Sequence, residues 1–85
     1  MPWRRELARR AIRDLDGLPD RDRVAVEAAI GRLVAAPSAV DLVKLGGSRN
    51  EWRMRVGNWR VFVELDNAAG QIRVLRVRRR TSTTY

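Results

Sequence analysis

The stretch EWRMRVGNWRVFVEL (residues 51–65) decides the fold, because apolar and polar side chains alternate on both sides of Gly57-Asn58. Strict alternation predicts β-strands, and Gly-Asn between two such runs is typical of a two-residue hairpin turn. With Gly57 and Asn58 as the loop, six large apolar side chains share one face: Trp52, Met54, Val56, Trp59, Val61 and Val63. The other face then carries Arg53, Arg55 and Arg60.

The aromatic residues of this hairpin divide between the two faces. Trp52 and Trp59 lie on the apolar face, so core packing is favoured over stacking on nucleic-acid bases. Phe62 lies among the arginines by parity, where it can stack on a base or cover a small apolar cluster.

A third strand is predicted over residues 72–77, after a turn at residues 67–70. A four-residue loop would direct Ile72 and Val74 to the core. A three-residue loop with a bulge at Gly70 would instead direct Leu75 and Val77 there. We favour the second register, because it leaves Arg76, Arg78 and Arg80 on the face of Arg60.

The N-terminal half has helical periodicity. Residues 2–7 alternate briefly, which favours a short edge strand over the start of a helix. The next segment is an amphipathic helix with the stripe Ala11, Ile12, Leu15 and Leu18, ended by Gly17 and Pro19. A second helix begins at Asp20 as N-cap, carries the stripe Val26, Ile30, Leu33 and Val34, and stops at Pro37. The two form a helical hairpin, and residues 37–50 are predicted to be a connecting loop anchored by Leu42, Val43 and Leu45.

Composition limits the chemistry available. The chain has 85 residues, 45% of them hydrophobic, which predicts a single domain over residues 1–85. It has no Cys and no His, which excludes disulfides, Cys/His zinc sites, thiolate nucleophiles and Ser-His pairs. We therefore expect no metal and no small-molecule cofactor. No apolar run approaches the roughly 20 residues of a membrane helix, so we expect a soluble cytoplasmic protein with no membrane partner.

The net charge of +8 is concentrated in the C-terminal half. Residues 37–85 carry nine arginines and Lys44 against four acidic residues, so an anionic partner is expected there. Like charges side by side on a sheet face are destabilising unless a polyanion neutralises them, and this favours a binding surface. The alternative, that these arginines are ordinary solvated residues of the strands, has about equal weight. The acidic residues of the first half have no metal-ligand spacing and are interpreted as solvated helix residues and caps: Asp14, Asp16, Asp20, Asp22 and Glu27.

Several motifs together resemble the RelE/ParE toxin superfamily of bacterial toxin–antitoxin systems, from Leu7 to Tyr85. They are KLGG (residues 44–47), WRMRVGNWRVF (residues 52–62), VRRR (residues 77–80) and the late Tyr85. The resemblance implies an α+β domain in which an N-terminal helical hairpin packs on a small antiparallel sheet. It also implies a toxin held inactive by a cognate antitoxin. RelE-like members cleave messenger RNA in the ribosomal A site, so ribosome and mRNA are implied partners.

The resemblance also assigns roles. Arg53 and Arg55 match the basic pair of the family, often Lys in other members, and Arg60 matches a phosphate-binding arginine. Arg80 or Arg79 matches the arginine of the last strand, and Tyr85 the terminal tyrosine.

On this basis the predicted site is an endoribonuclease site. Arg60 and Arg80 clamp the scissile phosphate, Arg53 and Arg55 bind flanking phosphates or balance charge, and Tyr85 stacks on a base or moves a proton. Additional RNA contacts are expected from Lys44, Arg76, Arg78 and Arg79. No metal is needed, because RNA supplies its own 2′-hydroxyl nucleophile and arginines stabilise the charge on the phosphate.

Two other functions fit the same sequence. A ParE-like inhibitor of DNA gyrase would share the fold without a nuclease site, and a small basic RNA-binding domain would bind without cleaving. An antitoxin is implied under either toxin hypothesis, through an acidic amphipathic helix or strand laid over the arginines or across the helical hairpin.

Overall fold

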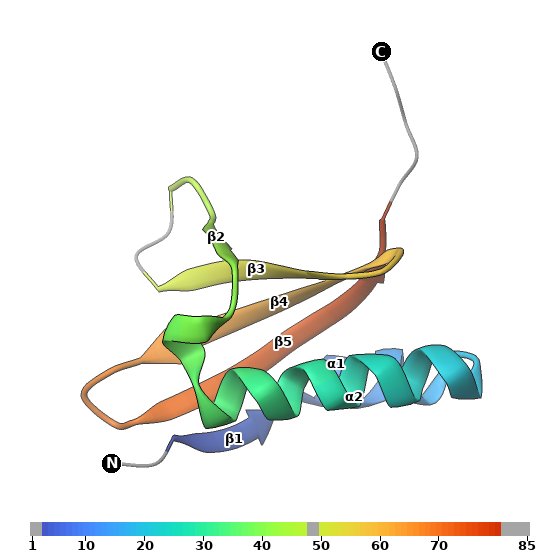
Figure 1. Cartoon of the computed structure of the whole chain (residues 1–85), viewed down its shortest axis with the longest axis horizontal. Helices are drawn as coiled ribbons and strands as arrows, with labels where there is room; N and C mark the ends of the chain where they lie inside the picture. The colour runs from blue at the N-terminus through green and yellow to red at the C-terminus, as the bar shows by residue number, and fades with distance from the viewer. Residues whose placement is uncertain (1–2, 48–49, 81–85) are drawn as a thin grey trace.

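The computed structural model describes residues 3–47 and 50–80, which form two α-helices and a five-stranded sheet (Figure 1). The elements are β1 (Arg4–Leu7), α1 (Arg9–Asp16), α2 (Asp20–Ala35), the 3-10 helix η1 (Pro37–Ala39), β2 (Leu42–Lys44), β3 (Glu51–Val56), β4 (Trp59–Asp66) and β5 (Gln71–Arg79). The strand order is β1-β5-β4-β3-β2. The predicted α+β class is confirmed, but the sheet is mixed, because β1 runs parallel to β5 while the other pairs are antiparallel.

The predicted hairpin register of β3 and β4 is confirmed. Val56 lies opposite Trp59, and the pairs Met54–Val61 and Trp52–Val63 follow along the same face. Met54, Val61 and Val63 are buried, and both tryptophans pack partly buried against the same core. The alternation of apolar residues therefore sets which face of the sheet meets the helices.

The turn of this hairpin depends on Gly57, whose φ of 56° lies in the left-handed region. Because a Cβ is strained there, we expect Gly57→Ala to destabilise the fold by about 1 kcal/mol, or roughly 4–8 °C in Tm. Gly46→Ala is the matched control, since a Cβ at Gly46 meets open space and its φ is not positive. Equal melting temperatures for the two variants would contradict the argument.

The three-residue loop predicted before β5 was wrong, but the predicted placement of Arg76 and Arg78 on the face of Arg60 is confirmed. Asp66 pairs with Gln71, so the loop has four residues and places Ile72 and Val74 in the core. A β-bulge then shifts the register: Phe62 pairs with Arg76 while the adjacent Val63 pairs with Val74, and Leu75 is the extra residue. The bulge sends Val77 to the core as well, so side chains from both alternative registers are buried there.

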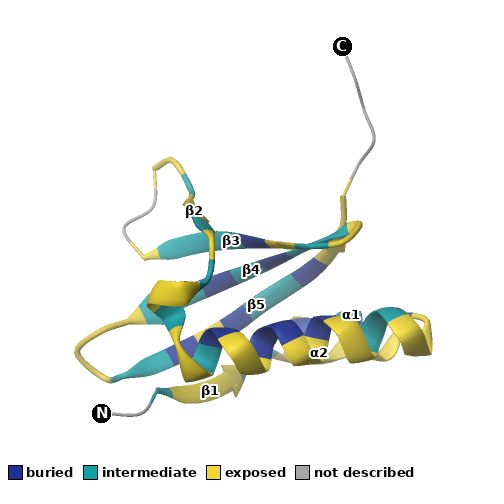
Figure 2. Cartoon of the chain, in the orientation of Figure 1, coloured by how far each residue is buried: buried dark blue, intermediate teal, exposed yellow. Residues whose placement is uncertain are grey.

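One hydrophobic core lies between the helices and one face of the sheet (Figure 2). Its helical part consists of Ala11, Leu15, Leu18, Val26, Ala29, Ile30 and Leu33, and its strand part of Met54, Val61, Val63, Ile72, Val74 and Val77. The predicted stripes are confirmed with one exception. Ile12 is 46% exposed, so the buried side of α1 is narrower than the predicted stripe and does not include it.

The connections around α2 differ from the predictions. Pro19, not Asp20, is the N-cap; Asp20 is the first helical residue, and its carboxylate pairs with Arg23 at 2.6 Å. Asp20 thus places negative charge in the first turn, where the helix dipole favours it. Residues 37–50 are not only loop: they contain η1 and β2, and β2 pairs antiparallel with β3.

Candidate active site

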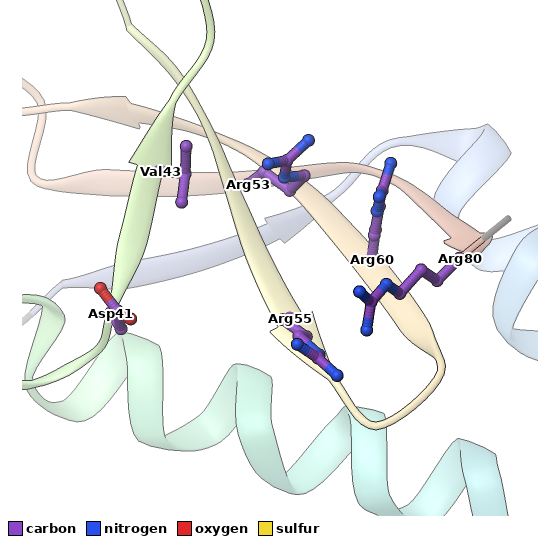
Figure 3. Close-up of a pocket in the computed structure, with 6 residues that line it drawn as sticks. All are labelled: Asp41, Val43, Arg53, Arg55, Arg60 and Arg80. Carbon is purple, nitrogen blue, oxygen red and sulfur yellow. The ribbon is translucent and has the colours of Figure 1, made fainter. Parts of the chain in front are cut away.

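A pocket of about 260 Å³ lies on the sheet face opposite the core, which we call the arginine face (Figure 3). It is lined by Asp41, Val43, Arg53, Arg55, Arg60 and Arg80. These residues come from the segment before β2, from β2, β3 and β4, and from the residue directly after β5. The pocket therefore gathers all four arginines predicted to be catalytic.

Strand pairing fixes the positions of these arginines. Arg55 and Arg60 lie directly opposite each other on β3 and β4, and Arg53 follows two residues away on the same face of β3. Arg80 is held beside the hairpin turn, because its backbone N–H donates to the carbonyl oxygen of Asn58 at 2.6 Å. The guanidinium groups thus project from backbone that main-chain hydrogen bonds hold in place.

The pocket concentrates positive charge. Within the described residues, none of its four arginines forms an ion pair with a carboxylate. Like charges directly opposite in a sheet are destabilising, as for Arg55 and Arg60. Guanidinium groups recognise phosphate oxygens through paired N–H donors, so a phosphate would relieve this repulsion. The arrangement is suited to a phosphodiester.

Sequence reasoning missed the side of the pocket that β2 supplies. Asp41 and Val43 lie there, and both are exposed. The available signal was the short run Leu42-Val43-Lys44, in which a strand would point Val43 away from Leu42. The structure has this alternation, with Leu42 opposite Met54 and Val43 opposite Arg53.

Two of the predicted RNA-binding residues lie on the core side of the sheet, away from the pocket. Lys44 pairs with Trp52, and its Nζ lies 5.8 Å from the centre of the indole ring. Arg79 pairs with Trp59, and its guanidinium carbon lies 6.0 Å from that ring. Both cations thus cover the half-buried tryptophans at distances typical of cation–π contacts.

The remaining predicted residues have different surroundings. Arg78 pairs with Arg60 on the arginine face but does not line the pocket. Arg76 pairs with Phe62, and its guanidinium group binds Asp14 on α1. Tyr85 lies outside the described residues.

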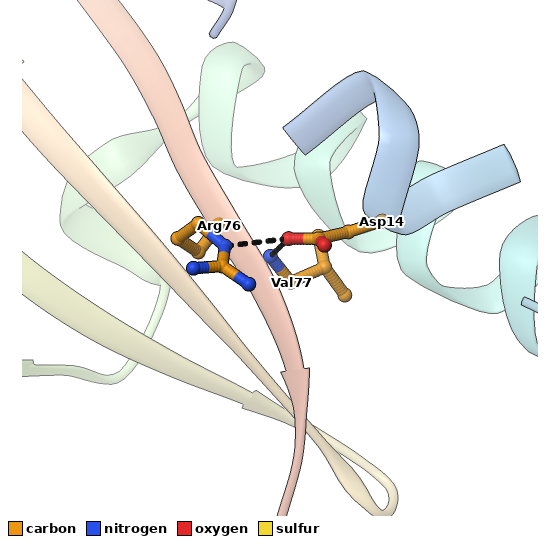
Figure 4. Close-up of polar contacts among 3 residues, drawn as sticks. All are labelled: Asp14, Arg76 and Val77. Carbon is orange, nitrogen blue, oxygen red and sulfur yellow. Dashed lines mark hydrogen bonds and ion pairs between the residues drawn. The ribbon is translucent and has the colours of Figure 1, made fainter. Parts of the chain in front are cut away.

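Asp14 is not a solvated helix residue, as the sequence suggested, but joins α1 to β5 (Figure 4). Its Oδ2 accepts hydrogen bonds from Arg76 Nε and from the backbone N–H of Val77, both at 2.9 Å. Partial burial raises the pKa of Asp14, but these two hydrogen bonds and the charges of Arg76 and Arg10 outweigh it and hold the pKa below the ordinary value. The carboxylate therefore stays ionised and occupies an edge position of β5 beyond the end of β1.

In the described part of the chain, no group of three or more acidic, His or Cys side chains could hold a metal ion. Nor does that part contain a helix long and apolar enough to cross a membrane.

Comparisons with known proteins agree on the kind of protein. The family model for the ParE toxin of type II toxin–antitoxin systems matches residues 5–83. The RelBE2 toxin–antitoxin complex of Mycobacterium tuberculosis contains a chain that is 30% identical, with a TM-score of 0.80; the match covers 94% of this chain and 100% of that one.

More distant structures share the fold. The RelE–RelB complex of Pyrococcus horikoshii OT3 matches with 22% identity and a TM-score of 0.82, over 98% of this chain and 100% of that one. The isolated E. coli RelE toxin matches with 14% identity and a TM-score of 0.81, over 95% and 87% of the two chains. No curated protein matches the sequence.

The fold and the matched family define a small α+β toxin of a type II toxin–antitoxin system. The chain belongs to the RelE/ParE toxin superfamily.

Proposed function

We propose that this toxin is a metal-independent endoribonuclease that cleaves messenger RNA on the ribosome, with the arginine pocket as its active site. The observation that carries the proposal is the convergence of Arg53, Arg55, Arg60 and Arg80 on one pocket, without carboxylate partners among the described residues. The resemblance to RelE-like members supplies the ribosome and the messenger RNA as partners.

The proposed chemistry uses charge and orientation. The RNA 2′-hydroxyl attacks the adjacent phosphorus in line with the leaving 5′-oxygen, and the phosphate gains negative charge in the transition state. Arg60 and Arg80 bind its oxygens, while Arg53 and Arg55 bind flanking phosphates. Strand pairing holds the backbone of Arg53, Arg55 and Arg60 before RNA binds, and the hydrogen bond to Asn58 holds that of Arg80. Their donors therefore need little rearrangement during the reaction.

The other predicted residues extend this proposal. Arg78, beside Arg60 on the arginine face, continues the cationic surface beyond the pocket. Contacts of RNA with Lys44, Arg76 and Arg79 would lie outside the pocket, and Tyr85 is proposed to stack on a base or move a proton.

We also propose that a cognate antitoxin binds this toxin. The solved relatives include toxin–antitoxin complexes from Mycobacterium tuberculosis and Pyrococcus horikoshii OT3. An acidic segment laid over the arginine face would neutralise the pocket and exclude RNA at the same time. The net charge of +8 supports an acidic partner of this kind.

Inhibition of DNA gyrase is the second candidate function, favoured by the match to the ParE model over residues 5–83. Gyrase inhibition needs no phosphate chemistry, so it gives no role to the four arginines that line the pocket. For this reason the nuclease is the better supported proposal.

One experiment separates the two functions. The toxin is induced in cells, and growth and the 5′ ends of transcripts are recorded together; gyrase supercoiling is assayed with the purified chain. We expect growth arrest with new cuts in codon phase and normal supercoiling. Growth arrest without new cuts, together with inhibited supercoiling, would establish the gyrase function instead.

A further inference from the structure

We infer that Asp41 is the group that accepts the proton of the RNA 2′-hydroxyl in the proposed cleavage reaction. The inference rests on the proposed function and adds a catalytic residue to it. Its basis is the composition of the pocket: among the described residues, the lining consists of four arginines, one valine and this single carboxylate.

The need for such a group comes from the arginines themselves. Guanidinium groups donate hydrogen bonds but cannot accept a proton. The pocket lining among the described residues has no Lys, His or Tyr, so Asp41 is its only side chain able to act as a base.

The backbone holds Asp41 toward the pocket. Val40 is extended, with φ of −102° and ψ of 139°, and it packs against the hydrophobic core, as does Leu42. Asp41 stands between these two anchors, and side chains alternate along an extended segment. The alternation therefore turns Asp41 to the same side as Val43, which lines the pocket.

The arrangement also matches the direction of an in-line displacement. Asp41 lies on one side of the pocket, at the base of β2, and Arg60 and Arg80 lie on the other (Figure 3). A phosphodiester bound between them would place the 2′-hydroxyl of its ribose toward Asp41 and the leaving 5′-oxygen toward the arginines. Within the described residues Asp41 forms no ion pair, so its oxygens remain available.

The proposed step is balanced as follows. The Asp41 carboxylate takes the 2′-hydroxyl proton as the bond from the 2′-oxygen to phosphorus forms. The bond from phosphorus to the 5′-oxygen breaks, and the leaving oxygen takes a proton from water. Asp41 then returns its proton to water, leaving a 2′,3′-cyclic phosphate and a 5′-hydroxyl.

The test compares Asp41→Asn with Asp16→Asn, which removes an equal charge from an exposed site on α1. Cleavage is measured in single turnover on ribosomes programmed with messenger RNA. Binding is measured separately with a message that carries 2′-deoxynucleotides in the A-site codon and cannot be cut. We expect Asp41→Asn to cleave roughly 10²-fold or more slowly, as for loss of a general base, and to bind the uncleavable message at least as tightly as wild type.

The binding arm distinguishes catalysis from structure. Removing a negative charge from a phosphate site does not weaken phosphate binding, whereas a collapsed pocket weakens binding and cleavage together. Asp41→Asn cleavage within about threefold of wild type, or a matching loss of binding, would overturn the assignment of Asp41 alone. An intact message with wild-type toxin would instead overturn the nuclease proposal, and the assignment with it.

Discussion

Replacing Arg60 and Arg80 together by alanine is expected to abolish both growth arrest and transcript cleavage. The two side chains line one pocket and are assigned to the same phosphate. Loss of one preorganised donor to a developing charge typically costs about 10²–10³-fold in rate, so the pair should cost at least about 10³-fold. The measurement is cleavage of messenger RNA on programmed ribosomes, with growth of induced cells as the cellular readout.

A matched variant controls for the loss of positive charge. Arg9→Ala plus Arg21→Ala removes the same two charges from exposed positions on α1 and α2. It should keep cleavage within a few-fold of wild type if pocket geometry, and not net charge, determines activity. An equal loss in both double variants would indicate general electrostatic attraction to RNA and would contradict the assignment of the phosphate clamp.

The fold was predictable where the determining signals are local. The alternation and the Gly57-Asn58 turn lie within one short stretch and agree with each other, so the register of β3 and β4 followed from them. The register of β5 could not be predicted in the same way, because two features each change it by one residue. The four-residue loop directs Ile72 and Val74 to the core, and the bulge at Leu75 then reverses the alternation, so that Val77 is buried as well.

The same distinction applies to the candidate site. Arg53, Arg55 and Arg60 share a face by parity alone, so their proximity could be read from the hairpin. Asp41 entered the pocket only because β2 pairs with β3, and three strand residues are too short a pattern to predict a strand. The contact of Asp14 with Arg76 spans 62 positions and depends on how α1 docks on β5, which no local pattern determines.

That contact supports the second prediction with a large effect. Asp14→Ala is expected to lower the free energy of unfolding by about 2 kcal/mol, the usual range for hydrogen bonds to a charged group. The variant loses both bonds to Asp14, and it leaves the backbone N–H of Val77, a buried residue, without its acceptor. In a domain of this size the change corresponds to roughly 10 °C in Tm. Asp14→Asn keeps an acceptor oxygen and should lose about half as much.

The pH dependence separates the ionised carboxylate from simple packing. Because the pKa of Asp14 is lower in the folded chain than its ordinary value of 3.8, its stabilisation is present above that value and is lost as the pH falls through the folded pKa. The stability difference between wild type and Asp14→Asn should therefore shrink below about pH 4. Asp16→Asn, two residues away and exposed, should match wild type at neutral pH. A difference that persists unchanged into acid would mean that the shape of Asp14, and not its charge, holds α1 against β5 at Arg76 and Val77.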